Sequence, residues 1–154
     1  MLKRILAAGI KTGGALALTT SLAVMTSSKR DTGDAWSAVN AICHIADGDD
    51  VSQPGGFRWR ESILGLGINA LAMTAWGLLY ESALLLTKHK STVVTGAAAS
   101  TSAYVIDYHI VPDRFKPGIE KRMSVQGVLL AYAVLALTLA ATPLWNDYQD
   151  RSAQ

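Results

Sequence analysis

Long runs of hydrophobic residues alternate with short polar stretches along this chain, and the pattern predicts four membrane-spanning helices. A bilayer core about 30 Å thick requires roughly 20 apolar residues in a helix. Inside lipid, helices satisfy every backbone N–H and C=O group within one segment. Four segments meet the requirement, at about residues 5–25, 63–87, 92–111 and 125–144. We therefore expect an all-α integral membrane bundle, formed by a single transmembrane domain over residues 1–154.

The first segment resembles a signal peptide in its basic start, but Lys11 interrupts its apolar region, which favours a retained helix. Gly9 and Gly13 form a GxxxG pair there, and the third segment carries small residues that include Gly96 and Ala99. Small residues let helix backbones approach closely in membranes. We expect both small faces to pack against other helices.

The polar stretch at residues 27–62 contains a shorter helical pattern. Its apolar positions recur at helical spacing: Trp36, Val39, Ile42, Cys43 and Ala46. Asp34 suits an N-cap and Gly48 suits a C-terminal stop. These features predict a short amphipathic helix over about residues 35–47 that lies at the membrane surface.

Composition and charge agree with a membrane location. Charged residues make up 17% of the chain, against about 25% in an average soluble domain. A net charge of +2 does not indicate a nucleic-acid partner. Four crossings place both termini on one side, where positive charge is denser, so we expect cytoplasmic termini.

The polar residues of the first loop are candidates for chemistry. Asn40, His44 and Asp47 are spaced i, i+4, i+7 and share one face of a helix. A carboxylate beside an imidazole fixes the tautomer of the ring and raises its basicity. The alternative is that the three residues form the solvated side of an amphipathic helix.

The end of the third segment carries Asp107, Tyr108 and His109, on the side of the membrane that holds His44. We predict one polar pocket there, surrounded by arginines: Arg58, Arg60 and Arg114. Guanidinium groups suit an anionic lipid headgroup, and His44 with His109 would suit a divalent metal. The alternatives are a hydrogen-bonded latch over the bundle and an Asp107–arginine ion pair.

Glu81 is the most deeply placed acid, within the second segment. An ionisable residue at that depth is costly and calls for a partner or a function. We expect an ion pair between Glu81 and Lys11, and the alternative is proton handling by Glu81. No catalytic motif occurs in the chain, so no catalytic residue is assigned and we expect no enzymatic activity.

Two motifs resemble those of a family of small, uncharacterised four-helix inner-membrane proteins of proteobacteria. They are the string at residues 40–44 followed by Gly48-Asp49, and the string at 107–112 followed by Arg114, Pro117-Gly118 and Glu120. The order of the elements also matches along most of the chain. The resemblance implies a multi-pass protein of the bacterial inner membrane and no particular activity.

These features favour a structural or accessory subunit of a membrane complex, without a cofactor. Its expected partners are the lipid bilayer and other membrane protein subunits, or further copies of itself. The alternatives are a redox subunit that binds haem b between two histidines, a metal or proton carrier, and an interfacial lipid-modifying enzyme. The carrier would use His44, Asp107 and His109.

Overall fold

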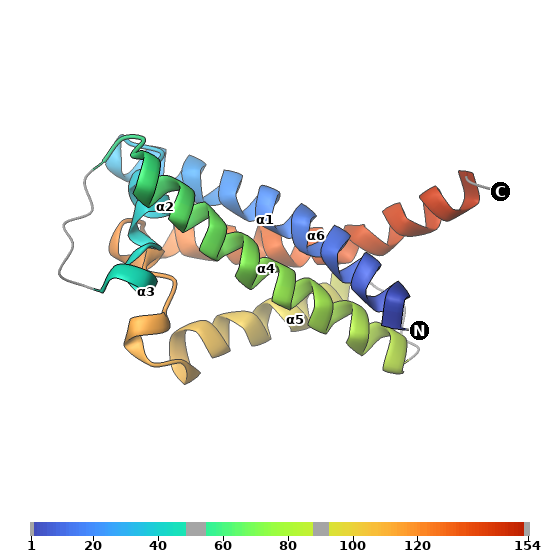
Figure 1. The fold of residues 1–154 in the computed structure, drawn as a ribbon. Helices are drawn as coiled ribbons and strands as arrows, with labels where there is room; N and C mark the ends of the chain where they lie inside the picture. The colour runs from blue at the N-terminus through green and yellow to red at the C-terminus, as the bar shows by residue number, and fades with distance from the viewer. Residues whose placement is uncertain (1, 49–54, 88–92, 153–154) are drawn as a thin grey trace.

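The computed structural model describes residues 2–48, 55–87 and 93–152, and these residues form helices and turns without any strand. Figure 1 shows a bundle of long helices with shorter helical elements gathered at one end. The start of α1 and the end of α6 lie together at the opposite end. The first and last described residues therefore lie at the same end of the bundle, which is compatible with the expected arrangement of the termini.

The long helices are α1 (Leu2–Thr32), α4 (Trp59–Thr87) and α6 (Val125–Ser152), with a shorter helix α5 (Val93–Val105). Helix α1 packs against both α4 and α6, and α6 also packs against α5. The main contacts therefore follow the order α4, α1, α6, α5. Helices α4 and α5 diverge toward the end that carries the short elements (Figure 1).

Three of these helices, α1, α4 and α6, are long and apolar enough to cross a membrane. Helix α1 is longer than predicted, because it continues beyond residue 25 to Thr32 and ends at Gly33. Gly33 has a φ of 79°, and its N–H donates to the Lys29 carbonyl at 3.0 Å, which is a left-handed helix cap. The third helix, predicted over about residues 92–111, corresponds to α5, which has 13 residues. A π-helical turn over Ile106–Ile110 follows it.

The short elements connect the long helices at the end opposite the termini (Figure 1). They are α2 (Ser37–Ala41), α3 (His44–Asp47), the π-helix η1 (Ile106–Ile110) and the 3₁₀-helices η2 (Asp113–Phe115) and η3 (Ile119–Lys121). Helix α2 contacts α1, α4 and η3, and α3 contacts η2. The two connecting segments therefore pack on each other as well as on the bundle.

The predicted surface helix over residues 35–47 differs from the structure, which has the two short helices α2 and α3 instead. All five residues of α2 are buried, because α1, α4 and η3 surround it. Asp34 is not the N-cap and instead accepts a hydrogen bond from the Gly56 N–H at 2.8 Å. Gly48 ends α3 as predicted, with a φ of 88°.

Glycines bring α1 and α4 into backbone contact. A β-carbon added to Gly77 would lie 2.6 Å from the Gly9 carbonyl oxygen and from the Gly13 nitrogen. A β-carbon added to Gly96 would similarly lie 2.5 Å from the Ala136 carbonyl oxygen of α6. The prediction that the GxxxG pair and the small-residue face of α5 meet other helices is confirmed.

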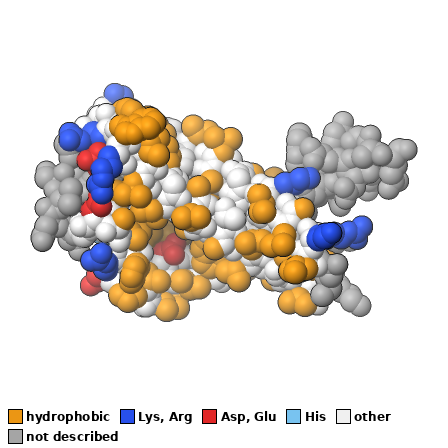
Figure 2. Space-filling view, viewed as in Figure 1, with side chains coloured by type: hydrophobic (Ala, Val, Ile, Leu, Met, Phe, Trp, Pro, Cys, Tyr) orange, Lys and Arg blue, Asp and Glu red, His pale blue; other side chains and the backbone are white. Residues whose placement is uncertain are grey.

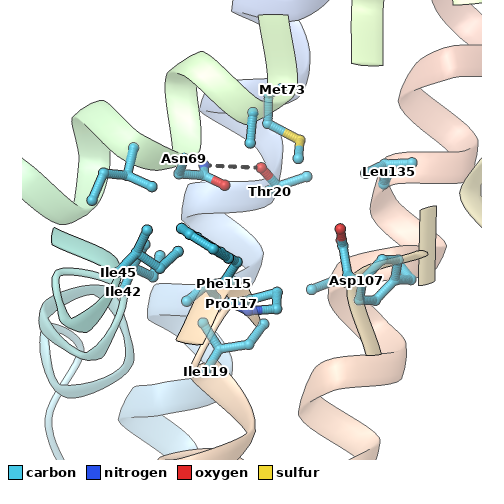
Figure 3. Close-up of a pocket in the computed structure, with 15 residues that line it drawn as sticks. Thr20, Ile42, Ile45, Asn69, Met73, Asp107, Phe115, Pro117, Ile119 and Leu135 are labelled. Carbon is cyan, nitrogen blue, oxygen red and sulfur yellow. Dashed lines mark hydrogen bonds between the residues drawn. The ribbon is translucent and has the colours of Figure 1, made fainter. Parts of the chain in front are cut away.

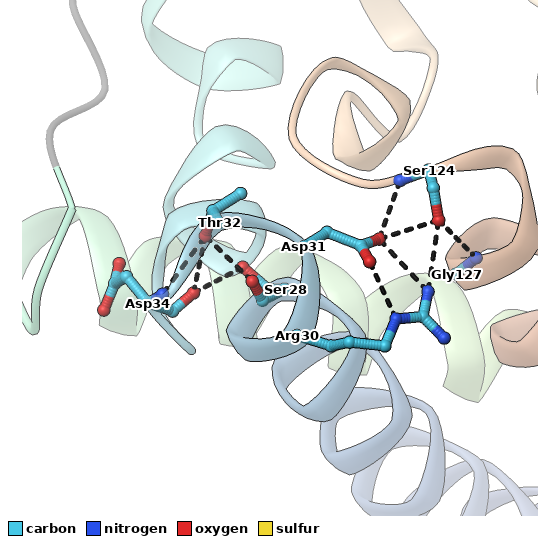
Figure 4. A network of polar contacts seen from close by, with 7 residues as sticks. All are labelled: Ser28, Arg30, Asp31, Thr32, Asp34, Ser124 and Gly127. Atoms are coloured by element: carbon cyan, nitrogen blue, oxygen red, sulfur yellow. Dashed lines mark hydrogen bonds and ion pairs between the residues drawn. The ribbon is translucent and has the colours of Figure 1, made fainter.

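A polar network joins the end of α1 to the start of α6 (Figure 4). The Asp31 carboxylate accepts hydrogen bonds from the Ser124 N–H and hydroxyl, both at 2.8 Å. Arg30 donates to the Asp31 carboxylate at 2.7 Å and to the Ser124 hydroxyl at 3.1 Å. The Ser124 hydroxyl in turn accepts the Gly127 N–H at 3.2 Å, which caps the first turn of α6.

The surface is divided into zones along the bundle axis. Figure 2 shows lysine and arginine side chains near the two ends and apolar side chains over the middle of the visible face. Large exposed hydrophobic residues occur along the long helices, for example Leu18, Leu71 and Leu137, which are 63%, 74% and 61% exposed. An apolar middle between charged ends is the pattern of a surface that faces lipid.

Candidate functional site

A cavity of about 120 Å³, partly open to the exterior, lies between the long helices in the half nearer to the short elements (Figure 3). Helices α1, α4 and α6 contribute to its wall, and the connecting segments close one side with Ile42, Ile45, Phe115, Pro117 and Ile119. A space of this size accommodates several water molecules or a short apolar group. The wall is mostly aliphatic, so its few polar groups determine what it can bind.

Asp107 is the charged group of this wall. Its side chain projects into the cavity (Figure 3), and its Oδ2 atom accepts a hydrogen bond from the Tyr132 hydroxyl at 2.7 Å. Asp107 lies in η1, where the Val111 N–H donates to the Ile106 carbonyl at 3.0 Å. This five-residue spacing inserts one residue relative to an α-helix, which changes the direction of the side chains that follow, and such turns occur often at functional sites.

Asn69 faces the cavity from α4, on the opposite wall. Its amide nitrogen donates to the Ser21 hydroxyl at 3.0 Å and to the Thr20 hydroxyl at 3.3 Å. These bonds to α1 fix the orientation of the amide, and its oxygen points toward the cavity (Figure 3). Two oxygen acceptors, from Asp107 and Asn69, are therefore directed into a mostly apolar space, in which the Thr20 and Tyr132 hydroxyls already bond to these two residues.

The arginines predicted around Asp107 have other partners. Arg60 forms two hydrogen bonds with the Asp47 carboxylate, at 2.6 and 2.7 Å, and Arg58 lies 3.7 Å from Glu61. Arg114 is exposed beside Gly48. The alternative of an Asp107–arginine ion pair is not observed among the described residues, because Asp107 turns into the bundle and bonds to a tyrosine.

His44 is buried between the first loop and the segment that precedes η3. It is only 4% exposed, and its Nδ1–H donates to the Ala41 carbonyl at 2.8 Å. Its Nε2 atom has no hydrogen-bond partner among the described residues. Gly118, with a φ of 78°, lies so close that an added β-carbon would be 2.6 Å from the ring. The histidine thus packs the two connecting segments together, but its hydrogen bond stays within its own segment, so the hydrogen-bonded latch is not seen at His44.

Asn40 and Asp47 face different surroundings from His44. Asn40 is fully buried and accepts a hydrogen bond from the Ser62 hydroxyl at 2.7 Å, and it donates to the Gly56 carbonyl at 2.9 Å. Asp47 pairs with Arg60, and hydrogen bonding to this guanidinium lowers the pKa of the Asp47 carboxyl below its usual value. Asn40 and Asp47 hold the first loop against α4, whereas His44 packs against Gly118, so the three residues do not form a common solvated face.

Tyr108 and His109 point away from the cavity. The Tyr108 hydroxyl donates to Glu120 at 3.3 Å, and the exposed His109 ring packs edge-on against Tyr104 at 5.9 Å between centroids. No contact joins His44 to Asp107 or His109 among the described residues. Within that part of the chain, no group of three His, Cys, Asp or Glu side chains is placed to hold a metal ion.

Glu81 lies at the α1–α4 contact and bonds to a different residue from the one predicted. The Thr12 hydroxyl donates to Glu81 Oε1 at 2.6 Å. The partner helix is α1, as expected. The bond, however, comes from Thr12, the residue after Lys11, and no Glu81–Lys11 ion pair is observed among the described residues. His89, the remaining histidine, lies outside the described residues.

The sequence arguments did not single out Asn69, Thr20 or Tyr132. Each is a polar side chain inside a long apolar segment. This feature could have identified them as candidates, because polar groups are rare and often functional at that depth. Which of them faces the cavity depends on how the helices are rotated against one another.

No family model, curated protein or solved structure matches the chain significantly. The nature of any ligand therefore follows from the chemistry of the cavity wall. An apolar space with two inward-facing oxygen acceptors fits a small amphipathic molecule that carries a hydrogen-bond donor.

Proposed function

We propose that this protein is a four-pass integral membrane protein whose interhelical cavity binds a small amphipathic molecule. The observation that carries the proposal is the direction of the Asp107 and Asn69 oxygens into an apolar cavity. A carboxyl group at this position is costly, and it calls for a partner beyond the single Tyr132 hydroxyl. A ligand with a donor group would supply that partner.

The fourth crossing in this proposal is made by α5 together with η1. These elements run continuously over residues 93–110, and 18 residues span about 27 Å at the α-helical rise. Helix α4 ends at the end of the bundle that holds the termini, whereas η2 and η3 pack beside α3 and α2 at the other end. This arrangement supports the proposal that α5 and η1 together supply a fourth crossing.

The chemistry of the cavity favours a donor on a short apolar chain. An amine fits best, because a protonated amine donates to both acceptors and compensates the charge of an ionised Asp107. The molecule would enter from the bilayer, since apolar residues surround the acceptors. Such binding suits an accessory subunit of a membrane complex, and the resemblance noted in the sequence favours the bacterial inner membrane as its location.

A proton carrier is the second candidate function, because a carboxyl group that faces a cavity within the membrane is the residue type that relays protons. A redox subunit that binds haem b is the other alternative from the sequence, but the described histidines do not offer a pair of axial ligands, because His44 is buried against Gly118 and His109 is exposed. An optical spectrum of the purified protein tests it, since bound haem produces a Soret band.

Thermal unfolding in detergent with n-octylamine tests the cavity. We expect the amine to raise the Tm of the wild-type protein, with a stabilisation of roughly 2.7 kcal/mol at a concentration about 100 times its Kd. n-Octanoate has the same length and the opposite charge, and it should not raise the Tm. Asp107→Asn keeps an acceptor for Tyr132 and should lose the response to the amine.

Glu81→Gln is the matched control. It removes an acid from the same membrane-spanning bundle and keeps an acceptor for Thr12, but Glu81 does not line the cavity. This variant should respond to octylamine as the wild type does. An equal response of the Asp107→Asn protein would show that the amine binds elsewhere, and the cavity proposal would then be abandoned.

A further inference from the structure

A second pocket, of about 150 Å³, lies between η1 and the start of α6, separate from the Asp107 cavity. The side chains of Tyr104 and Tyr108 form one wall, with ring centroids 5.0 Å apart and planes tilted by 40°. Glu120 and Met123 contribute from the segment that precedes α6. The pocket therefore combines two aromatic rings and one carboxylate.

The electrostatics of this pocket favour a cation. Glu120 is half-buried, and its carboxylate accepts one bond from the Tyr108 hydroxyl. Within the described part of the chain it forms no ion pair, and no lysine, arginine or histidine lines the pocket. Aromatic faces attract ammonium groups, and the attraction increases when the site is partly desolvated. A carboxylate beside two tyrosine rings is thus complementary to an ammonium ion.

The rim of the pocket indicates which kind of molecule would carry the ammonium group. Val125 and Leu129 also line it, and they are 74% and 54% exposed on α6. In a helix that crosses the membrane, such apolar residues contact acyl chains. Tyrosines at the end of a membrane helix occupy the headgroup level, where one end of the ring is apolar and the other is wet. A surface that contacts acyl chains thus lies directly beside a site that suits an ammonium group.

We propose that Tyr104, Tyr108 and Glu120 form a binding site for the ammonium headgroup of a zwitterionic phospholipid. The acyl chains lie against Val125 and Leu129, and the ammonium group sits beside the Glu120 carboxylate. This site does not depend on the Asp107 cavity, since it has its own acid, its own aromatic wall and its own apolar rim.

Native mass spectrometry of the protein purified with equimolar phosphatidylethanolamine and phosphatidylglycerol tests the site. The two lipids share the glycerophosphate unit, and only the first carries an ammonium group. We expect the wild-type protein to retain phosphatidylethanolamine about fivefold over phosphatidylglycerol, which is the order expected for one partly screened ion pair with a cation–π contact. Glu120→Gln should lower this ratio markedly, and the remaining preference would come from the two tyrosine rings.

Glu120→Gln is nearly isosteric and keeps an acceptor for Tyr108, and an unchanged Tm would show that it folds. Two further variants test whether its effect is specific to the pocket. Tyr104→Leu removes an aromatic face without a change in charge and should reduce the ratio in part. Glu61→Gln removes an acid that pairs with Arg58 outside the pocket and should retain the wild-type ratio. Equal retention of both lipids by the wild type, or an equal loss in Glu61→Gln, would overturn the proposal.

Discussion

At the scale of single residues, side-chain hydrogen bonds fasten helices to each other where apolar packing alone gives little orientation. Thr12 bonds to Glu81 across α1 and α4, and the Ser100 hydroxyl donates to the Tyr132 carbonyl at 2.6 Å across α5 and α6. Bonds of this kind contribute roughly 0.6 kcal/mol each on average in membrane helices. Their directionality fixes the rotation of each helix, and so decides which residues face the cavity.

The Asp47–Arg60 pair predicts a pH dependence. Hydrogen bonding to Arg60 lowers the pKa of Asp47 in the folded protein, below the value of about 3.9 for an unfolded chain. The stabilisation is therefore complete at neutral pH, and it disappears as the pH falls through the folded pKa. We expect the wild type to have a higher Tm than Asp47→Asn near neutral pH and an equal Tm in strong acid. A difference that stays constant down to strong acid would contradict this assignment.

At the scale of elements, glycines and the π-turn account for the arrangement of the helices. Gly9, Gly13 and Gly77 allow α1 and α4 to approach through their backbones. Asp107 lies in the wide turn of η1 and projects into the cavity, where it meets the Tyr132 hydroxyl. Pro112 follows once the backbone has become extended at Val111, with a ψ of 145°. Substituting these positions should therefore disturb packing more than a change of similar size on the lipid-facing surface.

The glycine contact is tested by Gly77→Ala. The added β-carbon would meet backbone atoms of α1 at 2.6 Å, and backbone cannot move aside cheaply. We expect a loss of about 1–3 kcal/mol, typical of overpacking, measured by unfolding in detergent. Gly67→Ala is the control in the same helix, because no atom lies within 4 Å of its added β-carbon. That variant should be neutral or slightly stabilised by helix propensity. Equal stability of both variants would show that the backbones are not in contact.

At the scale of the whole molecule, the order α4, α1, α6, α5 leaves the two outer helices diverging at one end (Figure 1). The short elements pack into that end, and Ile42, Phe115 and Ile119 cover the cavity there. The cavity is therefore a consequence of how four long segments and two connecting segments are assembled. No single element contains it.

The proposed topology is tested by cysteine labelling. Lys3→Cys near the start of α1 and Asp113→Cys in η2 place exposed thiols at opposite ends of the bundle. A membrane-impermeant maleimide should label only Asp113→Cys in intact cells if the termini are cytoplasmic, and only Lys3→Cys in inverted vesicles. The native Cys43 is fully buried and serves as the unlabelled control. Labelling of both positions from one side would mean that an even number of crossings lies between them, which would contradict the three crossings that the four-pass proposal requires.

The sequence alone determined the positions of the long helices, the shared end of the two termini and the helix contacts made by Gly9, Gly13 and Gly96. These features depend on local properties: the length of apolar segments, the breaks between them and the absence of side-chain bulk. Asp107 could also be predicted as a functional candidate, because the cost of an acid at that depth depends only on its place in an apolar segment.

Only the tertiary structure decided which polar groups meet. The sequence predicts one side of the bundle for His44, Asp107 and His109. In the structure, His44 lies in the contact between the connecting segments, Asp107 faces the cavity and His109 faces the exterior. The rotation of each helix, the extra residue in the turn of η1 and the burial of α2 set these directions. All three result from contacts between segments far apart in the chain, which hydrophobic periodicity along one segment does not encode.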